Sequence, residues 1–233
     1  MKAPYLAAGL VALGLTTAAQ AGPMKGEAEL GIVMVSGNSE SESLSGKVSL
    51  EKDMGKWLHS GSLQGTNASS NNVRSTERYL ANAKSDYKFT ENDYLFIALS
   101  YEDDRFSGYD YRATESVGYG RRLIATDTLT LNAEIGAGAR QSKLDSGASE
   151  NEGIVRGNGK LAWNISDTST FTQELLVESG DSATISKSIT GLKVQVAGSL
   201  AMKLGYTAKY TSEVPAGIEK TDTETTVTLV YGF

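Results

Sequence analysis

The sequence predicts an all-β fold, a transmembrane antiparallel β-barrel of about 12 strands, from three observations. Apolar and polar residues alternate from residue 27 to the end, and no stretch there has convincing helical periodicity. The alternating stretches run for ten or more residues, whereas strands of soluble sheets usually have about five or six. The last stretch, 227–233, alternates up to a terminal Phe233, although chain ends usually fray into water. Such a strand needs apolar surroundings along its whole length.

Composition limits the kind of membrane protein and the kind of partner. The chain has no apolar run of the roughly 18 residues that a membrane-spanning helix needs, so a membrane protein here must be a barrel. Its 22 basic and 28 acidic residues leave no surplus of positive charge, which argues against nucleic acid as a binding partner. The chain has no Cys and only three Pro, none inside an alternating stretch, as an ordered sheet requires.

The N-terminus resembles a secretory signal peptide. Lys2 supplies the positive charge, residues 5–17 form a short apolar run, and Ala19 and Ala21 frame a cleavage site before Gly22. A short membrane anchor or a core helix is the alternative. We therefore expect a cleaved signal peptide at 1–21 and a single barrel domain at 22–233.

The strands follow from the alternation, taken in order along the chain. In the second, Leu44, Gly46, Val48 and Leu50 alternate with polar residues, and the seventh and eleventh repeat this pattern over greater lengths. The fifth is the least certain, because residues 94–99 are apolar on both faces. The predicted strands are 27–36, 42–52, 57–67, 76–89, 94–104, 111–123, 128–141, 153–165, 169–178, 184–196, 200–211 and 222–233.

The connections alternate in character. Short turns are predicted at 53–56, 90–93, 124–127, 166–168 and 197–199. Mostly longer connections, rich in Ser, Asn, Asp and Gly, are predicted at 37–41, 68–75, 105–110, 142–152, 179–183 and 212–221. Outer-membrane barrels have short turns on the periplasmic side and longer loops outside, which predicts an even strand number and periplasmic termini. An exported soluble β-sandwich is the alternative, but it explains neither the strand length nor this alternation.

Aromatic residues gather near strand ends, as in the girdles at the two membrane interfaces. The group predicted at the periplasmic rim is Trp57, Tyr87, Phe89, Tyr94, Trp163, Tyr231 and Phe233. The group predicted nearer the opposite rim is Tyr101, Tyr109, Tyr111, Tyr119 and Tyr210. In the last strand, Val227, Leu229, Tyr231 and Phe233 are expected to face lipid.

The polar face of each strand is assigned to the lumen. The basic residues placed there are Lys47, Arg78, Lys84, Lys88, Arg122, Arg140, Arg156, Lys160, Lys193, Lys203 and Lys209. The acidic ones are Glu27, Glu29, Glu51, Asp86, Glu102, Asp104, Glu134, Glu174 and Glu224. These charges predict either a structural network of ion pairs or a narrow pore whose slight basic excess favours anions.

No catalytic residue and no cofactor are predicted. The chain has no Cys, its single His59 shares the outward face of Trp57 near the periplasmic rim, and no hydrolase or phosphate-loop motif occurs. A barrel hydrolase would need Ser and His together at the outer rim. We therefore expect a protein that is not an enzyme.

One acidic segment is open to two interpretations. Residues 101–112 hold four acids, two Arg and three Tyr around Gly108. They could contact a divalent cation or lipopolysaccharide, since hard cations prefer clustered carboxylates. Alternatively, Arg105 and Arg112 neutralise the acids within a salt-bridged loop. No ligand spacing matches a defined motif, so the metal question stays open.

The chain resembles the YdiY-like family, described as salt-induced outer-membrane proteins and otherwise as a domain of unknown function. The resemblance rests on the Ser36-Gly37-Asn38 opening, Trp57, the segment 102–110, the Gly118-Tyr119-Gly120 strand and the terminal aromatic. It covers essentially the whole mature chain and implies an outer-membrane barrel of Gram-negative bacteria. It brings no catalytic residues.

Together these observations predict a narrow, weakly selective pore linked to osmotic or envelope stress. The alternative is a closed structural or adhesion barrel that acts through its extracellular loops. The partners expected are outer-membrane lipid, lipopolysaccharide and, through the C-terminal strand, the barrel assembly machinery. We expect a monomer.

Overall fold

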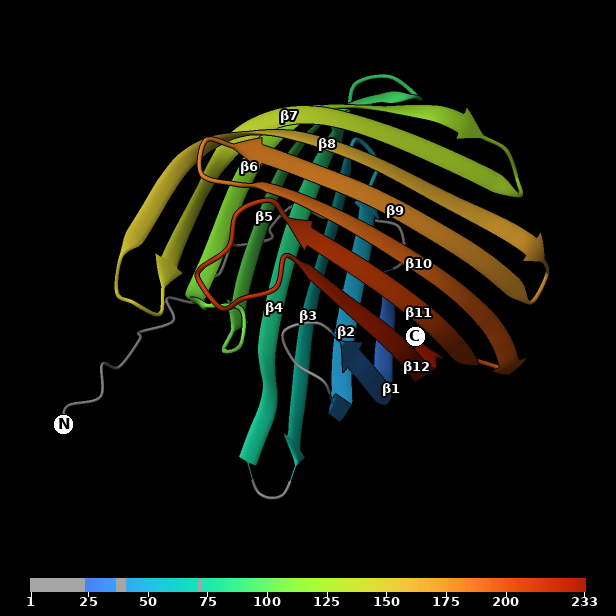
Figure 1. Cartoon of the computed structure of the whole chain (residues 1–233). Helices are drawn as coiled ribbons and strands as arrows, with labels where there is room; N and C mark the ends of the chain where they lie inside the picture. Colours follow the sequence, from blue (N-terminus) through green and yellow to red (C-terminus); the bar gives the residue numbers. More distant parts are fainter. Residues whose placement is uncertain (1–23, 37–40, 71–72) are drawn as a thin grey trace.

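The computed structural model describes residues 24–36, 41–70 and 73–233, so the predicted signal peptide at 1–21 lies outside the described residues. Within these ranges the chain forms twelve strands and no helix that is long and apolar enough to cross a membrane (Figure 1). The strands are β1 (Met24–Ser36), β2 (Ser41–Met54), β3 (Trp57–Ser70), β4 (Val73–Lys88), β5 (Asp93–Asp104), β6 (Tyr109–Ala125), β7 (Leu129–Leu144), β8 (Ser149–Ser166), β9 (Ser169–Gly180), β10 (Thr184–Ala197), β11 (Leu200–Thr211) and β12 (Thr221–Gly232).

The strands form a closed barrel in which each pairs antiparallel with its neighbours in sequence. β12 closes the ring on β1, with a register that runs from Glu27 opposite Gly232 to Ser36 opposite Thr223. At the end of this ladder, Phe233 and Gly26 exchange backbone hydrogen bonds of 2.8 and 2.9 Å. Closure removes both sheet edges, so the ladder continues around the whole ring. The predicted all-β fold is confirmed, including the uncertain fifth strand.

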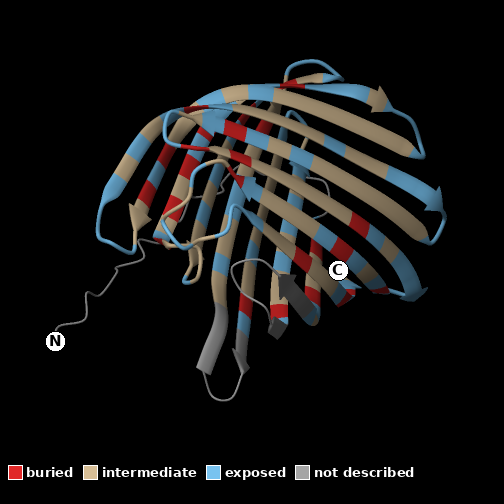
Figure 2. Ribbon diagram, viewed as in Figure 1, coloured by how far each residue is buried: buried red, intermediate tan, exposed pale blue. Residues whose placement is uncertain are grey.

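The barrel is apolar outside and polar inside. On β12, Leu229 exposes 53% of its surface on the outside, whereas its inward neighbour Thr228 exposes only 5%. Figure 2 shows exposed, intermediate and buried residues mixed along the strands, and parts of β5 and β12 alternate between exposed and covered residues. The outward set predicted for the last strand is thus confirmed. A soluble protein would bury its apolar residues, so this inversion is typical of barrels that lie in lipid.

Strand pairing continues into the segments predicted as longer connections. The predicted connection 68–75 is mostly strand, because β3 extends to Ser70 and β4 begins at Val73. The connection 142–152 likewise shrinks to 145–148, and among the connections that the structure describes only 212–220, between β11 and β12, stays long. Polar residues can continue a hydrogen-bonded ladder in water, so the end of apolar alternation is not the end of a strand. The prediction that one class of connection is mostly longer than the other was therefore wrong.

Aromatic pairs mark both rims, with two corrections. Trp57 lies 5.0 Å from Tyr87 between ring centroids at the rim of the short turns, and Tyr101 lies 5.9 Å from Tyr111 near the opposite rim. Tyr119, predicted nearer that opposite rim, instead contacts Phe89 at the short-turn rim, because it lies well down β6.

Tyr94 was predicted to belong to the outward girdle, but it faces the lumen with 8% exposure. Its strand also turns Phe96 inward, and both rings lie on a wall of glycines contributed by β6 and β7. A Cβ at Gly120 would lie 2.3 Å from the Tyr94 ring, and one at Gly118 would lie 2.7 Å from Phe96. The missing side chains on the wall make room for the two inward rings.

Candidate functional site: the lumen and its constriction

The lumen is lined by charged side chains that pair across the bore, as the face assignment predicted. One pair joins Lys209 Nζ on β11 to Glu102 Oε1 on β5 at 2.8 Å and to Oε2 at 2.9 Å. These two strands lie on opposite sides of the twelve-membered ring. A second pair joins Arg78 on β4 to Glu224 on β12. The two pairs link opposite and distant walls near the rim where β5 and β11 end.

The contact between opposite walls obstructs the bore at this level. The side chains of Lys209 and Glu102 are 15% and 21% exposed, whereas those of Lys193 and Glu27 near the short-turn rim are both 39% exposed. We call this level the constriction cluster. It consists of Arg78, Glu102, Arg112, Lys187, Lys209 and Glu224.

Two cations of this cluster were not predicted from the sequence. Lys187 lies directly opposite Lys209 in the β10–β11 register, and Arg112 lies opposite Glu102 in the β5–β6 register. Lys187 lies on the same face of its strand as Lys193, and Arg112 lies on the same face as Arg122. Since Lys193 and Arg122 were assigned to the lumen, the alternation could also have placed Lys187 and Arg112 there. Arg112 was considered only as part of the segment 101–112, either at a cation or lipopolysaccharide site or in a salt-bridged loop, although the predicted strand 111–123 already included it.

The half of the lumen nearer the short turns holds a second network of ion pairs. Glu29 accepts a hydrogen bond from Lys203 at 3.0 Å and lies 3.9 Å from Lys47, both on neighbouring walls. Lys84 on β4 contacts Glu134 on β7 at 2.7 Å, and the Tyr94 hydroxyl donates to the same carboxylate at 2.8 Å. Acids and bases are mixed here, so this level has no strong preference for one sign of charge.

The segment 101–112 divides between the two faces of the barrel. Glu102 points into the lumen, while Asp110 forms an ion pair with Lys143 at 2.9 Å and Arg105 bonds Glu77 of β4 at 3.0 Å. Arg105 therefore pairs with an acid of another strand, while Arg112 lies opposite Glu102 in the β5–β6 register without an ion-pair contact to it. The described residues contain no group of three or more His, Cys, Asp or Glu side chains that could hold a metal ion.

His59 faces outward beside Trp57, stacked at 5.8 Å between ring centroids, as predicted. Its Nδ1 forms a 2.8 Å hydrogen bond with Ser85 Oγ, a contact that the sequence analysis missed. A nucleophilic Ser–His pair needs a third group to orient the imidazole. Within the described residues, no carboxylate hydrogen-bonds to His59.

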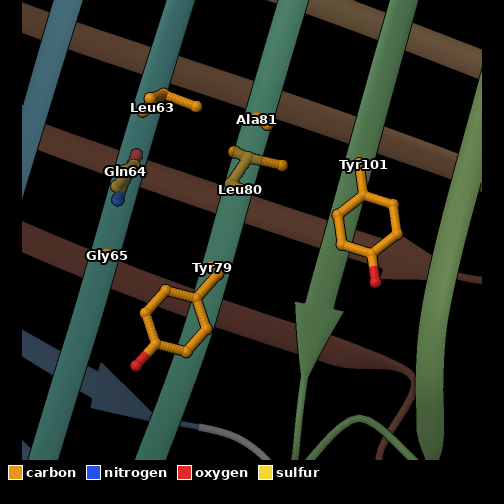
Figure 3. A pocket seen from close by; sticks show the side chains of 7 residues that line it. All are labelled: Leu63, Gln64, Gly65, Tyr79, Leu80, Ala81 and Tyr101. Atoms are coloured by element: carbon orange, nitrogen blue, oxygen red, sulfur yellow. The ribbon is translucent and has the colours of Figure 1, made fainter. Parts of the chain in front are cut away.

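An apolar groove of about 310 Å³ lies on the outside of β3, β4 and β5 (Figure 3). Tyr79 and Tyr101 are among its lining residues; Gly65 lies opposite Tyr79 in the register, and Ala81 lies opposite Tyr101. These residues share the outward face with Leu63, so the groove is separate from the lumen.

Comparisons with known proteins agree with the geometry. A model of the family described as "Protein of unknown function, DUF481" matches residues 28–233. The protein printed as "Uncharacterized protein YdiY" of Escherichia coli (strain K12) is 32% identical over 212 residues, which cover 90% of this chain and 83% of that protein.

Two solved barrels are similar in fold. The NanC porin has a TM-score of 0.60 at 10% identity, covering 88% of this chain and 98% of its own. The translocator domain of the autotransporter NalP from Neisseria meningitidis has a TM-score of 0.55 at 13% identity, covering 90% and 88%. At these identities the likeness concerns the fold alone.

Proposed function

Because the chain belongs to the family described as protein of unknown function DUF481, and its barrel is of the porin and channel type, we propose that it forms a narrow, weakly selective pore in the bacterial outer membrane. The observation that carries this proposal is a charged lumen with half-exposed side chains, such as Lys193 and Glu27, inside an apolar outer surface. Charged walls of mixed sign let hydrated ions pass with little discrimination.

The proposed orientation has both termini and the short turns in the periplasm. In this orientation residues 1–21 are removed on export, and the outward face of β12 is the signal that the assembly machinery recognises. Lipid and lipopolysaccharide cover the apolar belt between the two sets of aromatic pairs. The pore works as a monomer, is not an enzyme, and serves under osmotic or envelope stress.

A closed barrel that acts through its loops is the second candidate. The Lys209–Glu102 pair favours it, because a contact between opposite walls obstructs the bore. The two candidates therefore differ in whether the constriction cluster lets ions pass.

Single-channel recording in planar bilayers tests the proposal. We expect steady current from the refolded protein at neutral pH, and a larger current from the double variant Glu102→Ser, Lys209→Ser, which removes the bridge across the bore. The matched control is Glu27→Ser, Lys193→Ser, which removes a pair near the short-turn rim, outside the constriction cluster, and leaves the conductance nearly unchanged. Electrical silence of all three proteins in several salts would contradict the pore and support the closed barrel.

A further inference from the structure

Two inward cations at the constriction have no ion-pair partner among the described residues. The Arg112 residue is only 8% exposed, and its Nε has no hydrogen-bond partner. Its guanidinium lies 4.1 Å from the centroid of the Tyr109 ring, which fixes its position. Lys187 faces Glu102 and Glu224 without a contact within 4.0 Å to either, since those carboxylates bind Lys209 and Arg78. Leaving a buried cation unpaired is costly, so an unpaired Arg in a covered position points to a missing anion.

The register places these cations on either side of the bridge across the lumen. Arg112 lies beside Glu102 on one wall, and Lys187 lies beside Lys209 on the opposite wall. Glu102 and Lys209 neutralise each other, so the bridge carries no net charge, and Arg112 and Lys187 lie beside its two ends without an ion-pair contact of their own. The nearby Arg78–Glu224 pair adds no net charge.

Asp222 and Asp104 are two further inward carboxylates at this level. Asp222 lies opposite Lys209 in the β11–β12 register. Asp104 lies opposite Arg78 in the β4–β5 register and accepts a hydrogen bond from the backbone N–H of Phe106 at 3.1 Å. It is therefore engaged with its own turn and does not contact Arg112 or Lys187. The cations and carboxylates of this level are therefore equal in number, and Arg112 and Lys187 are the two cations that form no ion pair with a described carboxylate.

We propose that Arg112, Lys187 and Lys209 form an oxyanion-binding site at the constriction, which takes small solutes with a phosphate, sulfate or carboxylate group. This inference rests on the proposed pore and names the class of solute that it favours. The planar guanidinium of Arg112 can bind two oxygens of such a group, and the lysines supply point charges from the facing wall. The Tyr109 ring holds the guanidinium in place, so little side-chain entropy is lost on binding.

Inorganic phosphate is the probe for this site. In planar bilayers we expect the wild-type reversal potential in a salt gradient to indicate anion preference, and phosphate to reduce the chloride current in a concentration-dependent way. The double variant Arg112→Gln, Lys187→Gln should shift the reversal potential towards zero and lose the phosphate effect. The matched control is Lys193→Gln, which removes an inward cation outside the cluster and should retain both properties.

Folding and conduction are checked separately. Heat-modifiable gel migration shows that each variant is folded, and Arg112→Lys, which keeps the charge, should retain part of the phosphate effect. A wild-type pore that conducts without anion preference or phosphate effect would overturn the site and leave the pore intact. If the wild type is silent, the pore is wrong. Line broadening of the phosphate ³¹P signal by the folded barrel then decides the site: loss of broadening in the double variant supports it, and equal broadening overturns it.

Discussion

Glu115 places a carboxyl group on the outward face of β6, where the neighbouring outward residues are apolar. Leu99 of β5 and Ala139 of β7 lie opposite it in the register. It lies midway between Tyr111 and Tyr119, which form aromatic pairs near opposite rims. The proposed membrane position therefore puts Glu115 in the hydrocarbon layer. A single acidic residue there is tolerated at a smaller cost than Lys or Arg.

Replacing Glu115 by Leu should therefore stabilise the barrel. We expect the free energy of unfolding in vesicles to rise by about 1 kcal/mol, because the variant removes the cost of placing a carboxyl group against lipid. Equilibrium unfolding in denaturant measures the change. Glu134→Leu, which removes an inward partner of Lys84, should lower the stability instead. An unchanged or lower stability for Glu115→Leu would mean that Glu115 does not face hydrocarbon.

Position 118 on β6 requires glycine, because the backbone of β7 approaches it closely. A Cβ there would lie 2.2 Å from the carbonyl oxygen of Ile135, which cannot move aside as a side chain would. Gly118→Ala should lower the free energy of unfolding by about 1–3 kcal/mol through overpacking. Gly157→Ala is the control, since a Cβ there meets no atom within 4 Å. Equal stability of the two variants by denaturant unfolding would refute this explanation.

At the scale of the element, the faces of the strands were predictable and their ends were not. Alternation along β11 assigned Leu204 outward and Lys209 inward, because a strand turns successive side chains to opposite faces. The ends of β3 and β4 were missed, because backbone pairing continues where polar residues replace apolar ones. The Lys209–Glu102 contact was also not predictable, since it joins residues 107 apart in sequence and depends on how the barrel curves.

The two faces of β11 should respond differently to the same charge. Leu204→Lys places an ammonium group on the outward face in the middle of the strand and should cost about 2–4 kcal/mol in the proposed membrane position. Thr207→Lys places the same group in the lumen, opposite Glu224 in the register, and should be tolerated. Denaturant unfolding of both variants in vesicles is the measurement. Similar costs would show that the face assignment of β11 is wrong.

At the scale of the whole molecule, closure of the ring brings together the two ends of the barrel domain. The Phe233 backbone pairs with Gly26, and its ring lies where a side chain at Gly26 would be, with the nearest ring carbon 2.3 Å from an ideal Cβ. The terminal residue therefore packs against β1 in the finished barrel. Its aromatic ring also stacks on Tyr231 at 6.2 Å between centroids, on the outward face.

Phe233→Ala should separate assembly in the cell from stability of the finished barrel. The backbone hydrogen bonds between positions 233 and 26 do not need the ring, so the refolded variant should keep the closed barrel and its heat-modifiable migration. In cells we expect much less folded protein in the outer membrane, because the proposed assembly signal loses its terminal aromatic. Phe89→Ala is the control, since it removes an outward aromatic at the same rim without changing the last strand. Outer-membrane fractionation with gel migration measures both variants, and equal folded amounts would contradict recognition through Phe233.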